Sequence, residues 1–181
     1  VSTPASQTVC SDQAITQIVL TTSNGMTAGT TYSWTRDNTI NVTGLAGSGT
    51  GDISGTPNNV TGVDQTVTYT ITPTGGNGCV GNPFTATVIV RSEPVGVSTP
   101  ATQTVCSDQA ITQIVLTTSN GMTAGTTYSW TRDKLVEVTG LAASGTGDIS
   151  GIPNNVTGVD QTVTYTITPT GGNGCVGNPF T

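Results

Sequence analysis

Several short segments of the chain alternate between apolar and polar residues. The clearest is QTVTYTITPT at residues 65–74, which places Val67, Tyr69 and Ile71 on one face and threonines on the other. A period of two is typical of a β-strand with one buried face and one face in water. The same pattern predicts strands at three further segments: residues 14–22, 31–36 and 84–90.

Six aromatic residues fall at inward positions of these strands and of their counterparts later in the chain. They are Tyr32, Trp34, Tyr69, Tyr128, Trp130 and Tyr165. Because aromatic side chains bury large apolar areas, we expect these six to form the centre of the core. The aliphatic and remaining aromatic residues expected beside them are Ile18, Leu20, Leu45, Ile53, Phe84, Ala86, Val88 and Val90.

The chain repeats itself with a period of 96 residues, so that Val1 matches Val97 without a gap. Over the shared positions, 1–85 and 97–181, the two copies differ at only seven. A segment of this length can bury a core of its own. We therefore expect two domains, residues 1–93 and 94–181, and such similar copies are typical of a longer array.

Composition supports an all-β fold. Threonine, valine and isoleucine favour strands, while glycine, asparagine and proline favour turns, and no stretch has the sustained spacing of an amphipathic helix. About seven strands in fewer than 100 residues predict, in each domain, an antiparallel immunoglobulin-like β-sandwich. A net charge of −6 with four basic residues leaves no basic patch for a nucleic acid. No segment has the length and apolarity of a membrane span.

Each repeat contains two cysteines that are 69 residues apart, Cys10 and Cys79 in the first and Cys106 and Cys175 in the second. Zinc sites use four thiolates or imidazoles in closely spaced pairs, and the chain has no histidine and no CxxC. We expect one disulfide within each repeat, Cys10–Cys79 and Cys106–Cys175, with buried free thiols as the alternative. Disulfides indicate an oxidising, extracellular compartment.

Catalytic chemistry finds little support. A nucleophile needs a base, and there is no histidine and a single lysine, Lys134. Asp52 and Asp64 are conceivable as a carboxylate pair, but both lie in turn contexts where aspartate caps its own backbone. We expect no enzyme, no resident cofactor and no metal. Calcium is the one cation left open, through the carboxylates Asp12, Asp37, Asp52, Asp64 and Glu93, although no calcium-loop motif occurs.

Four of the seven differences lie in one run, NTIN at residues 38–41 against KLVE at residues 134–137. One interpretation is a loop or edge strand that diversifies between repeats to bind different glycans or neighbours. The other, which we favour, is an exposed edge under weak constraint, where Lys and Glu discourage strand pairing.

Two stretches of the first repeat resemble a known family. VCSDQAITQIVLTTSNGMTAGTTYSWTRDN and VTYTITPTGGNGCVGNPFTATVIV are similar to the PKD-like repeats of very large Bacteroidota surface proteins. These include gliding-motility adhesins of the SprB type, exported by type IX secretion. The resemblance implies tandem Ig-like modules in a long extracellular stalk or filament, and it implies no catalytic residues.

The expected function is therefore a structural stalk module at the cell surface, projecting an adhesive tip for attachment or gliding. Neighbouring repeats are the expected partners, and a surface polysaccharide or another cell-surface ligand would bind through other domains. The alternatives are a module that itself binds glycan or a host, and a filament subunit joined by strand donation. The segment RSEPVGVSTP between the repeats is short and contains two prolines, so we expect restricted bending there.

The sequence contains a second copy of GGNGCVGNPFT, at 171–181, but only one copy of the ATVIV that follows the first. We expect the chain to be an excerpt of a longer protein. In the second repeat, Val163, Tyr165 and Ile167 are expected to border an open groove unless a further strand covers them.

Overall fold

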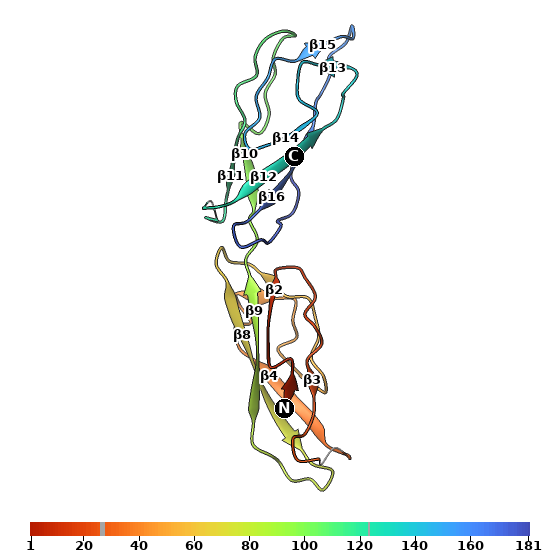
Figure 1. Ribbon diagram of the computed structural model, residues 1–181, viewed down its shortest axis with the longest axis vertical. Helices are drawn as coiled ribbons and strands as arrows, with labels where there is room; N and C mark the ends of the chain where they lie inside the picture. Colours follow the sequence, from red (N-terminus) through yellow and green to blue (C-terminus); the bar gives the residue numbers. More distant parts are fainter. Residues whose placement is uncertain (26–27, 123) are drawn as a thin grey trace. The chain divides into compact units, whose positions relative to one another are not determined.

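A computed structural model describes residues 1–25, 28–122 and 124–181, which divide into two compact units, Val1–Ser92 and Glu93–Thr181 (Figure 1). Every regular element among these residues is a β-strand. Unit 1 contains β1 Ser2–Thr3, β2 Ser6–Cys10, β3 Val19–Leu20, β4 Thr31–Arg36, β5 Val42–Thr43, β6 Ser48–Thr50, β7 Asn58–Asn59, β8 Gln65–Thr74 and β9 Phe84–Arg91. Unit 2 contains β10 Gly96–Thr99, β11 Val115–Thr118, β12 Thr127–Arg132, β13 Val138–Thr139, β14 Ser144–Thr146, β15 Asn154–Asn155 and β16 Tyr165–Thr170.

The main sheet of unit 1 has five strands in the order β2-β9-β8-β4-β6. Its strands pair antiparallel except for β2, which runs parallel to β9. The pairs β1-β3 and β5-β7 form two small sheets. Figure 1 shows β2, β9 and β8 side by side in unit 1. The antiparallel sandwich expected from the alternating pattern is therefore present, with one parallel pair added.

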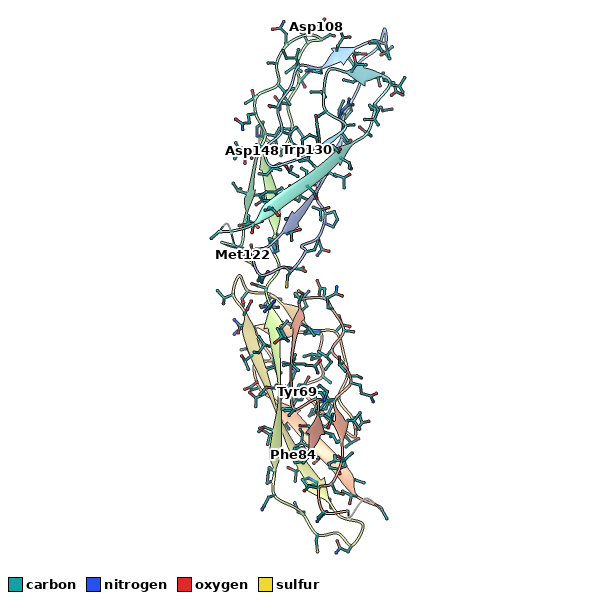
Figure 2. The ribbon with its side chains drawn as sticks, in the orientation of Figure 1. Tyr69, Phe84, Asp108, Met122, Trp130 and Asp148 are labelled. Atoms are coloured by element: carbon teal, nitrogen blue, oxygen red, sulfur yellow. The ribbon has the colours of Figure 1, made fainter. Side chains whose placement is uncertain are left out.

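The buried faces of these strands form the core of unit 1. Val67, Tyr69 and Ile71 on β8 are at most 1% exposed, and Val88 on β9 lies opposite Val67. Tyr69 lies in the middle of the unit and Phe84 nearer the β8–β9 loop (Figure 2). The strand expected over residues 14–22 is shorter than expected, since only β3 forms there. The Asp52 carboxylate accepts from the Leu20 amide at 2.9 Å in place of a longer strand ladder.

Unit 2 has the same order of elements but a smaller sheet, β14-β12-β16. Residues 102–106 match β2 almost completely in sequence, yet they form no strand. In unit 1 the strands β2 and β8 both pair with β9, and the described part of unit 2 contains no counterpart of β9 beyond Phe180. As a result Val163 and Tyr165 are half-buried, whereas their counterparts Val67 and Tyr69 are buried.

Candidate functional site: the two ends of the repeat

The two cysteines of unit 1 lie at opposite ends of the main sheet. Cys10 closes β2 and is paired in register with Arg91, the last residue of β9. Cys79 lies in the loop that enters β9 at Phe84. Seven residue steps of β9 separate these ends, about 23 Å at ~3.3 Å per residue. A disulfide needs Cα atoms within about 7 Å, so Cys10 and Cys79 of one repeat cannot pair.

The bonding state of the four cysteines shows that the disulfides expected within each repeat, Cys10–Cys79 and Cys106–Cys175, are wrong. Cys10 and Cys175 are disulfide-bonded, while Cys79 and Cys106 are exposed free thiols. The alternative, buried free thiols, is also incorrect in part, because the two free thiols are exposed. The spacing of 69 residues in sequence carried no information about which end of the sheet each cysteine occupies.

A tight loop holds the second cysteine of each repeat in the same way. The Cys79 amide donates to Asn77 Oδ1 at 3.1 Å, and the Cys79 carbonyl accepts from the Gly75 amide at 2.9 Å. The corresponding bonds of Cys175 are 3.0 Å to Asn173 and 2.8 Å from Gly171. Gly78 supplies the positive φ of 81° that this loop requires. The thiol is thus presented by backbone hydrogen bonds rather than by a mobile loop.

A groove lies beside Cys79 at this end of unit 1, with a cavity of about 580 Å³. Its lining includes Asn24, Tyr32, Gly75, Cys79, Gly81 and Asn82. The Tyr32 hydroxyl is buried and makes no hydrogen bond. Burial, and to a smaller extent the Asp52 carboxylate, raise the pKa of Tyr32. The Tyr128 hydroxyl of unit 2 is likewise buried without a hydrogen-bond partner, so the unpaired hydroxyl is a feature of both repeats and does not by itself mark a ligand site.

In unit 2 the corresponding groove is occupied by the unit's own first residues. Asn120, the counterpart of Asn24, donates from Nδ2 to the Glu93 carbonyl at 2.8 Å and accepts from the Val95 amide at 3.3 Å. The Ser119 amide donates to the Val95 carbonyl at 2.9 Å.

Glycines on the floor of the unit 2 groove make room for Pro94, which is fully buried. A Cβ atom on Gly177 would collide with the Pro94 carbonyl oxygen, and one on Gly171 would lie 3.4 Å from Pro94 Cδ. Asn178, the counterpart of Asn82, donates to Glu93 Oε1 at 3.4 Å. The segment Glu93–Val95 is therefore an integral part of unit 2.

One arginine in each repeat, the half-buried Arg36 and the buried Arg132, holds the loop that follows β4 or β12. Arg36 donates from Nε to Ala46, from Nη1 to Asp37 and Asn38, and from Nη2 to Val42 and Leu45, always to backbone carbonyls at 2.9–3.2 Å. Arg132 makes the five corresponding bonds in unit 2 at 2.9–3.0 Å. All five guanidinium donors are thus satisfied. Sequence reasoning missed this residue, although an arginine at a strand end before a Gly-rich loop is a usable signal.

The variable run lies in the loop that this arginine holds. Residues 38–41 and 134–137 form a turn between β4 and β5 and between β12 and β13, not an edge strand. Ile40 is 84% exposed and Val136 is 79% exposed. The backbone is the same in both repeats, with the Val42 amide bonding Asn38 and the Val138 amide bonding Lys134. Only the exposed side chains differ between the two turns.

Five of the six aromatic residues assigned to the core are buried, and Tyr165 is half-buried. Trp34 packs edge-to-face on Tyr69 with ring centroids 5.5 Å apart, and Trp130 packs on Tyr165 in the same way. Trp34 donates from Nε1 to the Gly51 carbonyl at 2.9 Å. In Figure 2, Trp130 lies within the body of unit 2. These side chains are committed to packing and are not displayed for stacking on a ligand.

The aspartate carboxylates accept hydrogen bonds, mainly from backbone amides. Asp37 accepts from the Thr68 amide at 2.7 Å, and Asp64 accepts from the Ser92 amide at 3.1 Å. Asp52 accepts from the Leu20 amide and the Gln17 side chain. Within residues 1–25, 28–122 and 124–181, no group of three or more His, Cys, Asp or Glu could hold a metal ion. Nor does this part of the chain include a helix that is long and apolar enough to cross a membrane.

Comparisons with known proteins identify the family of both repeats. A family model described as the PKD-like domain matches residues 7–94 and 103–181. No curated protein matches the chain. Similar solved structures include CBD12 from CALX1.2 (10% identity, 98% of this chain and 79% of that chain, TM-score 0.34). A CsuC–CsuE chaperone–tip adhesion subunit complex of Acinetobacter baumannii has 11% identity over 96% of this chain and 93% of that chain, with a TM-score of 0.33.

The human desmocollin-1 ectodomain is a third such structure, with 13% identity, a TM-score of 0.31, and coverage of 98% of this chain and 35% of that chain. TM-scores this low carry no argument about function. The family model, by contrast, spans well over half of the chain. This protein is a tandem pair of repeats of the PKD-like domain family.

Proposed function

We propose that this chain is part of the structural stalk of a long, repetitive extracellular surface adhesin or filament. In this role the PKD-like repeats carry an adhesive tip away from the cell for attachment or gliding. Membership of the PKD-like family and a disulfide are consistent with an extracellular location. The assignment to SprB-type adhesins and type IX secretion rests on the sequence resemblance.

One observation carries the stalk proposal. The residues that join the repeats, Glu93–Val95, are buried or hydrogen-bonded within unit 2. A flexible tether would instead have a Gly- or Ser-rich composition and solvated backbone groups. A linker whose residues are packed into the following repeat has fewer backbone conformations available to it than a solvated one, which suits a stalk of tandem repeats.

Small-angle X-ray scattering tests this role on residues 1–181. Under the proposal, with the disulfide-bonded cysteines reduced, the native chain gives a narrow distribution of interdomain distances, and the double variant Glu93→Gly, Pro94→Gly gives a broader one. The conservative variant Glu93→Gln keeps the Glu93 carbonyl bond and serves as the matched control. Equal breadth for the native chain and the glycine variant would contradict the stalk.

A glycan- or host-binding module is the second candidate, and the exposed turn at residues 38–41 favours it. Its side chains differ between repeats while the backbone is retained, which suits a surface that is varied for recognition. A glycan array probed with the native chain and with Ile40→Ala, Val136→Ala distinguishes the two. Binding that the double variant abolishes would support recognition, and absence of binding would support the stalk.

A further inference from the structure

The outer face of the sheet β14-β12-β16 in unit 2 is built from short hydroxyl side chains (Figure 1). On β12, Tyr128 and Trp130 are buried in the core, so Ser129 and Thr131 between and after them face outward. Their partners on the two neighbouring strands share this face and are also serine or threonine. The six residues, called the hydroxyl face below, are Ser129, Thr131, Ser144, Thr146, Thr166 and Thr168.

The strand register arranges these hydroxyls in two rows that cross the strands. The rows are Thr146–Ser129–Thr168 and Ser144–Thr131–Thr166. Neighbouring residues of a row are about 4.8 Å apart, and the two rows are about 6.6 Å apart along the strands. A ligand that lies across the sheet therefore meets one hydroxyl on each strand.

The hydroxyl face surrounds an open hollow of about 400 Å³, which Trp130 and Gly145 also line. A Cβ atom added to Gly145 would meet the Trp130 ring, which packs on the core side, so the floor of the hollow is backbone. Five of the six hydroxyl residues are exposed and Thr168 is half-buried. Among the described residues, no protein group is hydrogen-bonded to these six hydroxyls. They are available to a ligand.

The same face is present in unit 1, on β6, β4 and β8. Its two rows are Thr50–Ser33–Thr72 and Ser48–Thr35–Thr70. None of the seven differences between the repeats falls on these positions. The hydroxyl face is thus a property of the repeat, in contrast to the exposed turn at residues 38–41, whose side chains change.

The chemistry of the hydroxyl face selects its partner. A hydroxyl both donates and accepts hydrogen bonds, and its natural complement is another hydroxyl. None of the six side chains is charged, and the net charge of −6 repels a polyanion. Because neighbouring strands are rotated by about 20–25°, a planar crystal surface cannot match all three strands, whereas a single flexible chain can follow them.

We propose that the hydroxyl face of each repeat binds a neutral polysaccharide as a single chain lying across the three strands. Sugar hydroxyls exchange hydrogen bonds with the serine and threonine hydroxyls, and the threonine methyl groups contact the C–H faces of the sugar rings. This binding is a function of the repeat beyond the stalk role. It needs no particular arrangement of the two units, so it holds whatever the scattering experiment shows.

Affinity electrophoresis in native gels tests the binding and the class of ligand. The neutral polymers are hydroxyethylcellulose, laminarin and galactomannan, each in its own gel, and alginate is the anionic comparison. At least one neutral polymer should retard the native chain, and alginate should not. Retardation by none of the three neutral polymers, or equal retardation by alginate, would overturn the proposal.

Replacement of threonine by valine removes a hydroxyl from each row and keeps the shape of the side chain. The quadruple variant is Thr35→Val, Thr72→Val, Thr131→Val, Thr168→Val. Since each site loses two hydrogen bonds, its apparent dissociation constant should rise at least about tenfold. The matched control is Thr16→Val, Thr112→Val, the same change at exposed positions outside the strands. Equal affinities of the quadruple variant and the control would refute the hydroxyl face.

A variant of one repeat tests whether each repeat has its own site, and it also serves if the quadruple variant fails to fold. Thr131→Val, Thr168→Val changes unit 2 alone and should give retardation between that of the native chain and that of a non-binding reference protein. Retardation equal to that of the native chain, or lost completely, would contradict one site in each repeat.

Two further arms separate this site from other surfaces. Ile40→Ala, Val136→Ala alters the exposed turns and should bind as the native chain does, and loss of binding in this variant would assign recognition to the turns. Sedimentation with insoluble crystalline cellulose tests the planar alternative. Retention on the crystals without retardation by any soluble polymer would show that a planar surface, and not a single chain, is the ligand.

Discussion

Arg36 donates from Nη2 to the carbonyl oxygen of Leu45 at 2.9 Å, and this bond ties the end of β4 to the loop that follows it. Four further donors of the same guanidinium bond carbonyls between residues 37 and 46. The loop has little regular structure of its own, so the side chain takes the place of a neighbouring strand. All five acceptors are backbone carbonyl oxygens, so backbone dipoles solvate the positive charge of Arg36.

Replacement of Arg36 by lysine should therefore be costly although charge is kept. Lysine has three donors on a flexible stem and cannot reproduce the planar fork. Carbonyls left without a partner should lower the free energy of unfolding by about 2–4 kcal/mol. Urea unfolding of Arg36→Lys measures this, with Arg91→Lys, at the exposed last residue of β9, as the control. Equal effects at the two sites would refute the bracing role.

A second prediction concerns the glycine beneath the tryptophan. A Cβ atom at Gly145 would overlap the Trp130 ring, so Gly145→Ala must displace the ring or the strand. We expect a loss of about 1–3 kcal/mol and a changed Trp130 fluorescence in a Trp34→Phe background. Gly158, where an added Cβ meets nothing within 4 Å, provides the control. If Gly158→Ala destabilises as much, steric overlap is not the cause.

The strands with regular alternation were predictable from sequence, because period-two patterning follows directly from burial of one face. β4 occupies residues 31–36 and β8 occupies residues 65–74, as expected. The strand expected over 14–22 is shorter because two of its amides donate to side chains: Gln7 Oε1 accepts from Thr16, and Asp52 accepts from Leu20. Such side-chain partners have no periodic signature.

The positions of the two cysteines and the packing of Pro94 could not be predicted in the same way. Whether Cys10 and Cys79 meet depends on the direction of β9 relative to β2, and a parallel pair places them at opposite ends. The docking of Pro94 depends on Gly171 and Gly177, which lie far from it in sequence. Both features arise from long-range topology rather than from local pattern.

Alkaline pH should destabilise the fold through its tyrosines. Burial raises the pKa of Tyr69, which the Arg36 guanidinium partly offsets, and burial likewise raises the pKa of Tyr165. Above pH about 10 the unfolded chain loses phenolic protons that the folded chain retains, so stability is full below that pH and falls as pH rises further. Phenolate absorption against pH, with and without urea, checks this. Identical titrations of folded and unfolded protein would contradict it.

The last prediction uses the two versions of the exposed turn as each other's control. Asn38 and Lys134 both have a φ of 52°, in the left-handed region that asparagine tolerates better than lysine. Asn38 also donates from Nδ2 to Gln65 Oε1 and to the Thr66 carbonyl at 3.0 Å. Lys134→Asn should therefore stabilise unit 2 by about 0.5–1 kcal/mol, and Asn38→Lys should destabilise unit 1 by at least as much.

Thermal unfolding of the two variants, followed by calorimetry, measures these opposite shifts. Lys134→Gln removes the charge without supplying a residue suited to positive φ, and it should leave the midpoint nearly unchanged. If Lys134→Gln stabilises as much as Lys134→Asn, removal of the lysine charge explains the gain and backbone strain does not. If both substitutions at residues 38 and 134 shift the midpoint in the same direction, the two turns are not equivalent, and the shared backbone geometry does not set their stability.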